Sequence, residues 1–356
     1  MTTPTKLQVS QMQKINWVAE CSKDFEVVEK LGEGSYGSVF HAIHRPTGTH
    51  AAVKTVRIDG DTTDVEKEIV LMKQCDTDYI VRFFGHFFVD KDLWIVMEIC
   101  GAGSVCDIMH ILNATLDERE IQIILKDTLH GLAYLHKMHM IHRDIKAANI
   151  LVSDDGVCKL ADFGVSTKMG GTNKLQKTLI GTPYWMAPEV ILESGHNEKA
   201  DIWSVGITAI EMFDGRPPHS ELHAMRAIFL IPNRPPPTLS TPEEVSKAFN
   251  DFIALCCVKN FRERPSALEL LKCDFMKPNG NRKRITDLIE KENEVIAEFG
   301  SRKKALEQGE DDDDDEGEDD DDTEEEEDDD DTEEEEEDDT EEDDSDDGDD
   351  TMVIRK

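Results

Sequence analysis

The sequence lacks any long apolar run. No stretch approaches the ~20 consecutive apolar residues that a membrane-spanning helix needs. Residues 1–20 also lack the apolar core of a secretory signal. We therefore expect a soluble protein of the cell interior, in the cytoplasm and also in the nucleus, with no membrane partner.

Cysteine motifs for metal binding are also missing. The chain has eight cysteines, but no C-x-x-C pair is matched by a second Cys or His pair. Cys256 and Cys257 are adjacent, which suits neither a metal cage nor a simple disulfide. We expect thiols in a reducing compartment, which argues against a disulfide framework and a zinc module.

Basic residues are scarce relative to acidic ones, but the imbalance is local. The formal net charge is −39, and 35 of the 41 residues over 310–350 are Asp or Glu. Residues 1–309 then hold 43 acidic and 37 basic residues. So acidic a segment cannot bury enough apolar surface to offset its ordering entropy. We predict a disordered, low-complexity tail over 309–350, and we expect no direct nucleic-acid partner.

The apolar and turn patterns divide residues 25–276 into two parts. β-type runs alternate with turn residues, and one helical stretch at 63–74 interrupts them; the runs are 25–31, 39–44, 50–57, 80–88 and 93–98. After Gly101 the pattern becomes helical, with proline clusters as breaks, over 105–112, 117–138, 199–213 and 247–259. The sequence predicts an α+β fold, with a small β-rich lobe and a larger helical lobe.

Shorter segments flank this predicted domain. Residues 1–24 are polar with scattered apolar positions and are expected to form a flexible lead-in. Apolar residues recur on one face over 282–306, which predicts an amphipathic helix in a 277–308 extension. The acidic tail contains a nine-residue repeat, at 319–327 and 328–336, and residues 351–356 form a short motif after it.

Six short motifs follow one another in a fixed order. They are Gly32-Glu33-Gly34-Ser35-Tyr36-Gly37-Ser38-Val39, Ala51-Ala52-Val53-Lys54, Glu68, His142-Arg143-Asp144-Ile145-Lys146-Ala147-Ala148-Asn149, Asp162-Phe163-Gly164 and Ala187-Pro188-Glu189. A lone G-x-G-x-x-G is weak evidence, because Rossmann folds also contain it. The ordered set as a whole resembles the protein kinase signature and implies the two-lobed kinase fold.

The resemblance implies an ATP-binding site built on the small lobe. Three glycines let a turn close over the phosphates without a Cβ in the way, and the predicted loop consists of Leu31, Gly32, Glu33, Gly34, Ser35, Tyr36, Gly37, Ser38 and Val39. Lys54 supplies a fixed cation to the α- and β-phosphates. We expect Glu68 to hold Lys54 by an ion pair. Glu66 is a rival, but the register of Glu68 relative to Met72 fits the kinase pattern better.

Phosphoryl transfer depends on positioning and charge neutralisation. Asp144 is expected to accept the proton of the substrate hydroxyl, while Asn149 and Asp162 supply oxygen ligands that suit Mg²⁺. Lys146 can reach the γ-phosphate, which favours serine or threonine as the acceptor. His142 reads as a packed structural histidine rather than a base, because Asp144 already fills that role.

Further stretches narrow the resemblance. Residues 181–189 (GTPYWMAPE) and 200–204 (ADIWS) are similar to sterile-twenty-like kinases of the germinal-centre group. Residues 92–98, 100–105 and 231–238 resemble the Hippo kinases, and the likeness covers roughly residues 20–308. Two features depart from that pattern. Ile99 stands where an aromatic residue is usual, and the dimerisation domain that follows the acidic linker of Hippo kinases is not in this sequence.

The Hippo resemblance implies roles for further residues. Met97 would be the gatekeeper, and Glu98 and Cys100 would lie in the hinge that binds adenine. Phosphorylation of Thr178 would activate the chain by pairing with Arg143, and Thr182 would be its structural neighbour. An ion pair between Glu189 and Arg264 would brace the helical lobe. The expected partners are protein substrates that include downstream kinases, Mob-type adaptors, and a second copy of the chain for trans-autophosphorylation.

Three functions remain to be weighed. The first is an active serine/threonine kinase that uses ATP and Mg²⁺. The second is a pseudokinase scaffold, which loss of Lys54, Asp144, Asn149 or Asp162 would favour, yet all four are present. The third is binding of basic proteins by the acidic tail. Separately, Thr351-Met352 resembles the phosphorylated docking pairs of Hippo linkers; the plain alternative is a frayed terminus with a chance Thr-Met pair.

Overall fold

The computed structural model describes residues 4–34, 37–58, 69, 72–162, 183–195, 197–277 and 280–311. Contacts divide the chain into one unit of Met1–Asp314 and a second of Asp315–Lys356. The second unit, which includes Thr351 and most of the acidic tail, lies outside the described residues. The first unit contains both predicted lobes.

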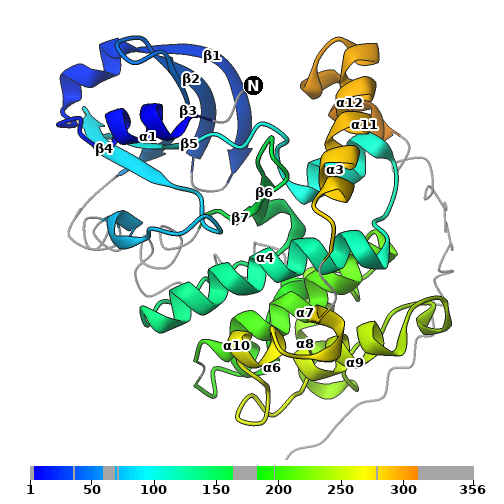
Figure 1. Ribbon diagram of the computed structural model, residues 1–356. Coiled ribbons are helices and arrows are strands. Elements are labelled where there is room, and N and C mark those ends of the chain that lie inside the picture. Colours follow the sequence, from blue (N-terminus) through cyan, green and yellow to red (C-terminus); the bar gives the residue numbers. More distant parts are fainter. Residues whose placement is uncertain are drawn as a thin grey trace, which may run out of the picture. The chain divides into compact units, whose positions relative to one another are not determined.

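An antiparallel sheet of five strands forms the small lobe (Figure 1). The strands lie in the order β1-β2-β3-β5-β4 and comprise β1 (Phe25–Gly34), β2 (Gly37–His44), β3 (Thr49–Arg57), β4 (Phe83–Val89) and β5 (Asp92–Glu98). β2 and β3 are joined by a turn in which Gly48 adopts φ +63° and donates to the carbonyl of His44 at 2.8 Å. The predicted β-rich lobe is therefore confirmed. Ile69 and Met72 are buried, but most of the helix predicted at 63–74 lies outside the described residues.

The prediction of a flexible lead-in is wrong for residues 4–24. Lys6–Met12 forms helix α1, which begins with a capping box, and a 3-10 turn, η1, follows at Ala19–Asp24. Met12 is fully buried, and the indole of Trp17 stacks on the rings of Phe25 and Phe87. Met12 and Trp17 therefore anchor this polar segment on the sheet, because burying them removes apolar surface from water.

Helices dominate the second lobe. α3 (Val105–Leu112), α4 (Glu118–Lys137), α7 (Lys199–Asp214) and α9 (Lys247–Cys256) correspond to predicted helices, and α7 packs against both α4 and α9. α8 (Ala224–Asn233) was not predicted, since Pro232, taken as a helix breaker, lies in its last turn. The shorter elements are η2 (Ala147–Asn149), β6 (Ile150–Val152), β7 (Cys158–Leu160), η3 (Pro183–Trp185), α6 (Pro188–Ile191), η4 (Pro242–Glu244), α10 (Ala267–Leu270) and η5 (Asp274–Met276).

The C-terminal extension consists of two helices, not the single amphipathic helix predicted. α11 (Lys283–Phe299) ends where Gly300 adopts φ +80°, and α12 (Arg302–Asp311) follows. Glycine adopts this left-handed conformation without a Cβ penalty, which explains the break. Among the described residues, no helix combines the length and the apolar character needed to cross a membrane.

Candidate active site

The cation expected to bind phosphate lies inside the small-lobe sheet. Lys54 belongs to β3 and pairs with Val39 of β2 and Ile95 of β5. Its side chain is 9% exposed, and its Nζ lies 2.6 Å from Oδ1 of Asp162. The structure therefore joins the predicted phosphate cation to a predicted metal ligand. Glu68, Phe163 and Gly164 lie outside the described residues, so the Lys54–Glu68 pair stays a prediction.

Asp144, Lys146 and Asn149 form one cluster on the loop that precedes β6. Nδ2 of Asn149 donates to both the carbonyl and Oδ2 of Asp144, each at 2.7 Å. Nζ of Lys146 lies 3.3 Å from the same Oδ2, and the Asp144 side chain is 46% exposed. These contacts fix the orientation of the carboxylate while leaving it accessible to a substrate hydroxyl.

The predicted metal ligands fit a hard divalent cation. Because Nδ2 of Asn149 is used by Asp144, its Oδ1 is the amide atom left for coordination. Asp162 contributes a carboxylate that is 44% exposed. An amide oxygen and a carboxylate suit Mg²⁺, which commonly takes its remaining ligands from water and substrate phosphates.

Asp201 of α7 anchors the loop of residues 142–149, called the catalytic loop below. Its carboxylate is 1% exposed and accepts hydrogen bonds from the backbone N–H groups of His142 and Arg143, at 2.9 and 2.8 Å. It also lies 2.8 Å from Nε2 of His136. Arg143 has φ +71°, a left-handed conformation that costs a non-glycine residue about 1–2 kcal/mol, so these bonds hold a strained backbone. In the sequence, Asp201 contributes only to the resemblance carried by residues 200–204, and its role as an anchor was not predicted.

His142 is buried beside this anchor. Its Nε2 lies 2.9 Å from the carbonyl of Ala161, and its Nδ1 accepts from the backbone N–H of Asp144 at 3.3 Å. Burial lowers the pKa of His142, although nearby acids including Asp201 oppose that shift. Backbone groups, one in the loop and one just after β7, thus engage both ring nitrogens, as expected for a packed structural histidine.

Glu211, also on α7, connects the catalytic loop to the segment before α6. Its Oε2 accepts hydrogen bonds from the backbone of Ala147 at 3.0 Å and from Nε1 of Trp185 at 2.8 Å. Burial raises the pKa of Glu211 to about 7, although both hydrogen bonds oppose the shift. The Trp185 ring centroid lies 6.0 Å from Nζ of Lys146, so Glu211 also positions the surroundings of that lysine.

The glycine-rich loop is only partly described. Gly32 and Gly34 belong to β1, Gly37 begins β2, and Ser35 and Tyr36 lie outside the described residues. Gly37 has φ +133°, and a Cβ there would lie 1.9 Å from the carbonyl oxygen of Thr55. Close packing on β3 is therefore one reason for glycine at this position, in addition to the predicted approach of phosphate. Leu31, Glu33, Ser38 and Val39 lie on the same two strands.

The expected hinge follows β5 directly. Met97 is half-buried and pairs with Ala52, and Cys100 is buried. Oε2 of Glu98 lies 3.2 Å from Nζ of Lys159 and 3.3 Å from the backbone N–H of Arg82. Because the side chain of Glu98 is engaged in this way, we expect the adenine contact of Glu98 to be made by its backbone.

Thr178 and Thr182 lie in residues 163–182, outside the described part of the chain. The ion pair expected beyond them is present. Arg264 is fully buried and donates from Nη1 and Nη2 to the two carboxylate oxygens of Glu189, at 2.7 and 3.0 Å. This bidentate pair ties α6 to the loop before α10.

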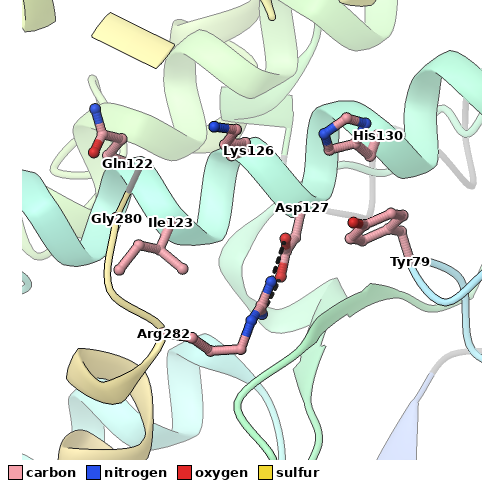
Figure 2. A pocket seen from close by; sticks show the side chains of 8 residues that line it. All are labelled: Tyr79, Gln122, Ile123, Lys126, Asp127, His130, Gly280 and Arg282. Atoms are coloured by element: carbon pink, nitrogen blue, oxygen red, sulfur yellow. Dashed lines mark hydrogen bonds and ion pairs between the residues drawn. The ribbon is translucent and has the colours of Figure 1, made fainter. Parts of the chain in front are cut away.

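A cavity of about 200 Å³ lies along α4 (Figure 2). Arg282 and Asp127 face each other in it and form a bidentate ion pair, at 2.7 and 3.0 Å. The full lining is Tyr79, Gln122, Ile123, Lys126, Asp127, His130, Gly280 and Arg282. None of the predicted site residues belongs to that lining, so this cavity is separate from the candidate active site.

Comparison with known proteins places the chain in a family. It is 52% identical over 287 residues to "Serine/threonine-protein kinase cst-1" of Caenorhabditis elegans, and 56% identical over 252 residues to the protein of that name from Caenorhabditis briggsae. The alignments cover 81% and 71% of this chain, but only 58% and 51% of the relatives. These matches confirm the resemblance to Hippo-type kinases over the aligned part. Residues 25–276 match the description "Protein kinase domain", and the chain belongs to that family.

Proposed function

We propose that this chain is an active serine/threonine protein kinase, which transfers the γ-phosphate of ATP to Ser or Thr hydroxyls of protein substrates. The observation that carries the proposal is the contact of Lys54 with Asp162, seen together with the cluster of Asp144, Lys146 and Asn149. Cation, metal-ligand and proton-accepting groups are thus all present and held in place. A pseudokinase scaffold would be favoured by the loss of one of them.

Each residue has a distinct task in this proposal. Mg²⁺ bound with ATP would neutralise phosphate charge, with Asn149 and Asp162 as its protein ligands. Lys54 binds the α- and β-phosphates, and Lys146 stabilises the charge on the γ-phosphate. Asp144 orients the substrate hydroxyl and accepts its proton as the oxygen attacks phosphorus. Asp201 and Glu211 act indirectly, by holding the backbone on which these side chains stand.

Regulation by phosphorylation of Thr178 is part of the same proposal. A phosphate adds a charge of about −2 and can order a loop by pairing with arginine. Arg143 is exposed, and its backbone is fixed by Asp201, which supports it as the partner. By family likeness we also propose cytoplasmic signalling to downstream kinases, a second copy of the chain as a partner for autophosphorylation, and recruitment of Mob-type adaptors through phosphorylated Thr351.

Mass spectrometry after incubation with Mg-ATP and a basic protein substrate would test the activity. We expect phosphate on serine and threonine, including Thr178 of the chain itself. The matched control is Asp144→Asn, which should lower kcat by at least ~10²-fold while ATP binding persists, because the proton acceptor is lost and an amide oxygen at this position can still accept from Nδ2 of Asn149. Equal rates for both proteins, or transfer to tyrosine only, would contradict the proposal.

A further inference from the structure

The C-terminal extension packs beside the expected nucleotide site. α11 and α12 lie against each other and against α3, the helix that begins just after the hinge (Figure 1). The buried residues of α11 include Ile285, Leu288 and Ile289, and Ala305 of α12 is 4% exposed. The extension is therefore part of the packed structure of the first unit, although the kinase-domain match ends at residue 276.

Arg302 is the charged residue at the centre of this contact. Its Nη2 lies 2.6 Å from Oε1 of Glu292, and its side chain is 16% exposed, while that of Glu292 is fully buried. Its Nη1 lies 3.7 Å from Oδ2 of Asp107. One guanidinium group thus bridges α11 and the first turn of α3.

The same guanidinium lies directly on Gly103. A Cβ added to Gly103 would be 2.1 Å from Nη1 of Arg302 and 2.8 Å from Oδ2 of Asp107. Gly103 also has φ +67°, a conformation that side chains rarely adopt. The absence of a side chain at Gly103 is what allows Arg302 to reach this position.

Gly103 belongs to the hinge loop, residues 100–104, which follows the expected adenine contacts. The carbonyl of Gly103 accepts from the backbone N–H of Val152 at 2.8 Å, and the backbone N–H of Ala102 donates to the carbonyl of Val152 at 3.2 Å. Ser104 and Asp107 then cap α3, with backbone-to-side-chain hydrogen bonds of 2.9 and 3.0 Å. The hinge loop is thus held by β6 and the α3 cap, and Arg302 lies against the loop and that cap.

We propose that Arg302 is a positioning residue for nucleotide binding, which makes α11 and α12 a working part of the ATP site. It acts through Gly103 and Asp107 by fixing the hinge loop in its binding conformation. A buried ion pair such as Arg302–Glu292 adds little stability compared with apolar packing, which favours positioning over stability as its role. The inference rests on the proposed function, because it assumes that the hinge binds ATP.

Direct nucleotide binding tests this proposal. Calorimetry with Mg-ADP should show a Kd about five- to tenfold higher for Arg302→Ala than for the wild type, the effect of losing roughly one ordinary polar contact. KM for ATP should rise in parallel, while kcat at saturating ATP stays within about twofold, since no catalytic group is altered. Arg302→Lys keeps the charge but not the planar fork and should give an intermediate Kd. The matched control is Lys303→Ala on the same helix, because Lys303 is 81% exposed and should leave Kd unchanged.

A double-mutant cycle with Gly103→Ala separates positioning from general damage. The backbone strain of alanine at 103 occurs with or without Arg302 and cancels in the cycle, whereas the clash with the guanidinium requires Arg302. Gly103→Ala should therefore weaken Mg-ADP binding more in the wild type than in Arg302→Ala. If Arg302→Ala does not fold, Arg302→Lys and Arg302→Met, which keep the aliphatic stem, take its place in the cycle.

The outcomes distinguish this inference from the proposed function. Additive effects together with an unchanged Kd in the Arg302 variants would overturn the positioning role alone. A wild type that binds Mg-ADP but transfers no phosphate would overturn the proposed activity, and the Kd series would still decide the role of Arg302. A wild type that binds no nucleotide would overturn both.

Discussion

Asp201 shows how one buried carboxylate supports the catalytic loop. It accepts two backbone hydrogen bonds and contacts His136, so replacement by Asn places an NH₂ group where an acceptor is needed. We expect Asp201→Asn to lower the free energy of unfolding by about 1–3 kcal/mol, the cost of leaving buried donors unpaired. kcat should fall about tenfold or more, because Asp144 stands on the released loop.

Thermal unfolding and steady-state kinetics check both effects. The matched control is Asp251→Asn, whose side chain is 57% exposed and, within the described part of the chain, pairs with Lys247 four residues earlier on the same helix. That variant should change neither quantity measurably, since exposed ion pairs contribute little. Wild-type kcat and stability in Asp201→Asn would show that the loop does not depend on this anchor.

The buried carboxyl group of Glu292 should make the stability of the folded protein depend on pH. Burial raises its pKa to about 7 despite the Arg302 guanidinium, against an ordinary value of 4.5. The folded state therefore holds a proton that the unfolded state releases, and stability from this group falls as pH rises from about 4.5 to about 7. Glu292→Gln, which cannot titrate, should lose less stability than the wild type between pH 5 and pH 8, by roughly 1–3 kcal/mol.

Urea unfolding of both proteins at several pH values provides the measurement. The remaining titrating groups are common to the two proteins, so their contributions cancel in the difference. Parallel pH profiles for wild type and Glu292→Gln would mean that folding does not raise the pKa of Glu292.

At the scale of elements, local patterns predicted some parts and missed others. The strands of the small lobe and helices such as α3 could be predicted from the sequence, because alternation and helical spacing of apolar residues are local signals. Asp201 and Glu211 were missed because their partners belong to a loop far away in the sequence. One signal could have identified both residues: each is an acidic residue in a helix, α7, that is otherwise almost continuously buried. Such acids need partners, since burying an unpaired charge is costly.

The prediction of a flexible lead-in over residues 1–24 failed for a related reason. The composition of this segment is polar, and only scattered apolar residues, Trp17 among them, pack on the sheet. Trp17 stacks on Phe25 and Phe87, donates from Nε1 to the carbonyl of Phe84 at 3.0 Å, and lies where a Cβ on Gly85 would be 2.0 Å from its ring. The absence of a side chain at Gly85 on β4 thus makes room for the Trp17 ring. The sequence of neither segment, taken alone, indicates this contact.

Trp17→Ala should therefore destabilise the small lobe. We expect a loss of about 2–4 kcal/mol in the free energy of unfolding, because the substitution removes a large ring from an aromatic cluster and an indole hydrogen bond. Denaturant unfolding measures this loss, with Leu7→Ala as the control, since Leu7 of α1 is 70% exposed. If both variants unfold at the wild-type midpoint, the lead-in is not part of the folded domain.

At the scale of the whole molecule, the acidic tail and the α11–α12 extension should behave differently. With 35 acidic residues over 310–350, the tail repels itself and has no apolar surface to bury. Ending the chain after Asp311, the last residue of α12, should leave Tm unchanged and the peptide-kinase rate within about twofold. A collapse in stability would mean that the tail binds a basic face of the domain, such as residues 281–284 or 301–304.

Ending the chain after Lys277 should instead be strongly destabilising, even though the kinase-domain match is then intact. This truncation removes α11 and α12 with their buried apolar residues, and it removes Arg282, which pairs with Asp127. Asp127 is 3% exposed and would keep only partners such as the backbone N–H of Cys158. The Arg282 side chain is itself 39% exposed, so leaving the buried carboxylate of Asp127 short of donors costs about 1–3 kcal/mol, and the uncovered face of α3 adds to that cost. Calorimetric unfolding of the two truncated proteins side by side measures the difference. Equal Tm values would show that the folded kinase unit ends near residue 277, and that α11 and α12 are dispensable for its stability.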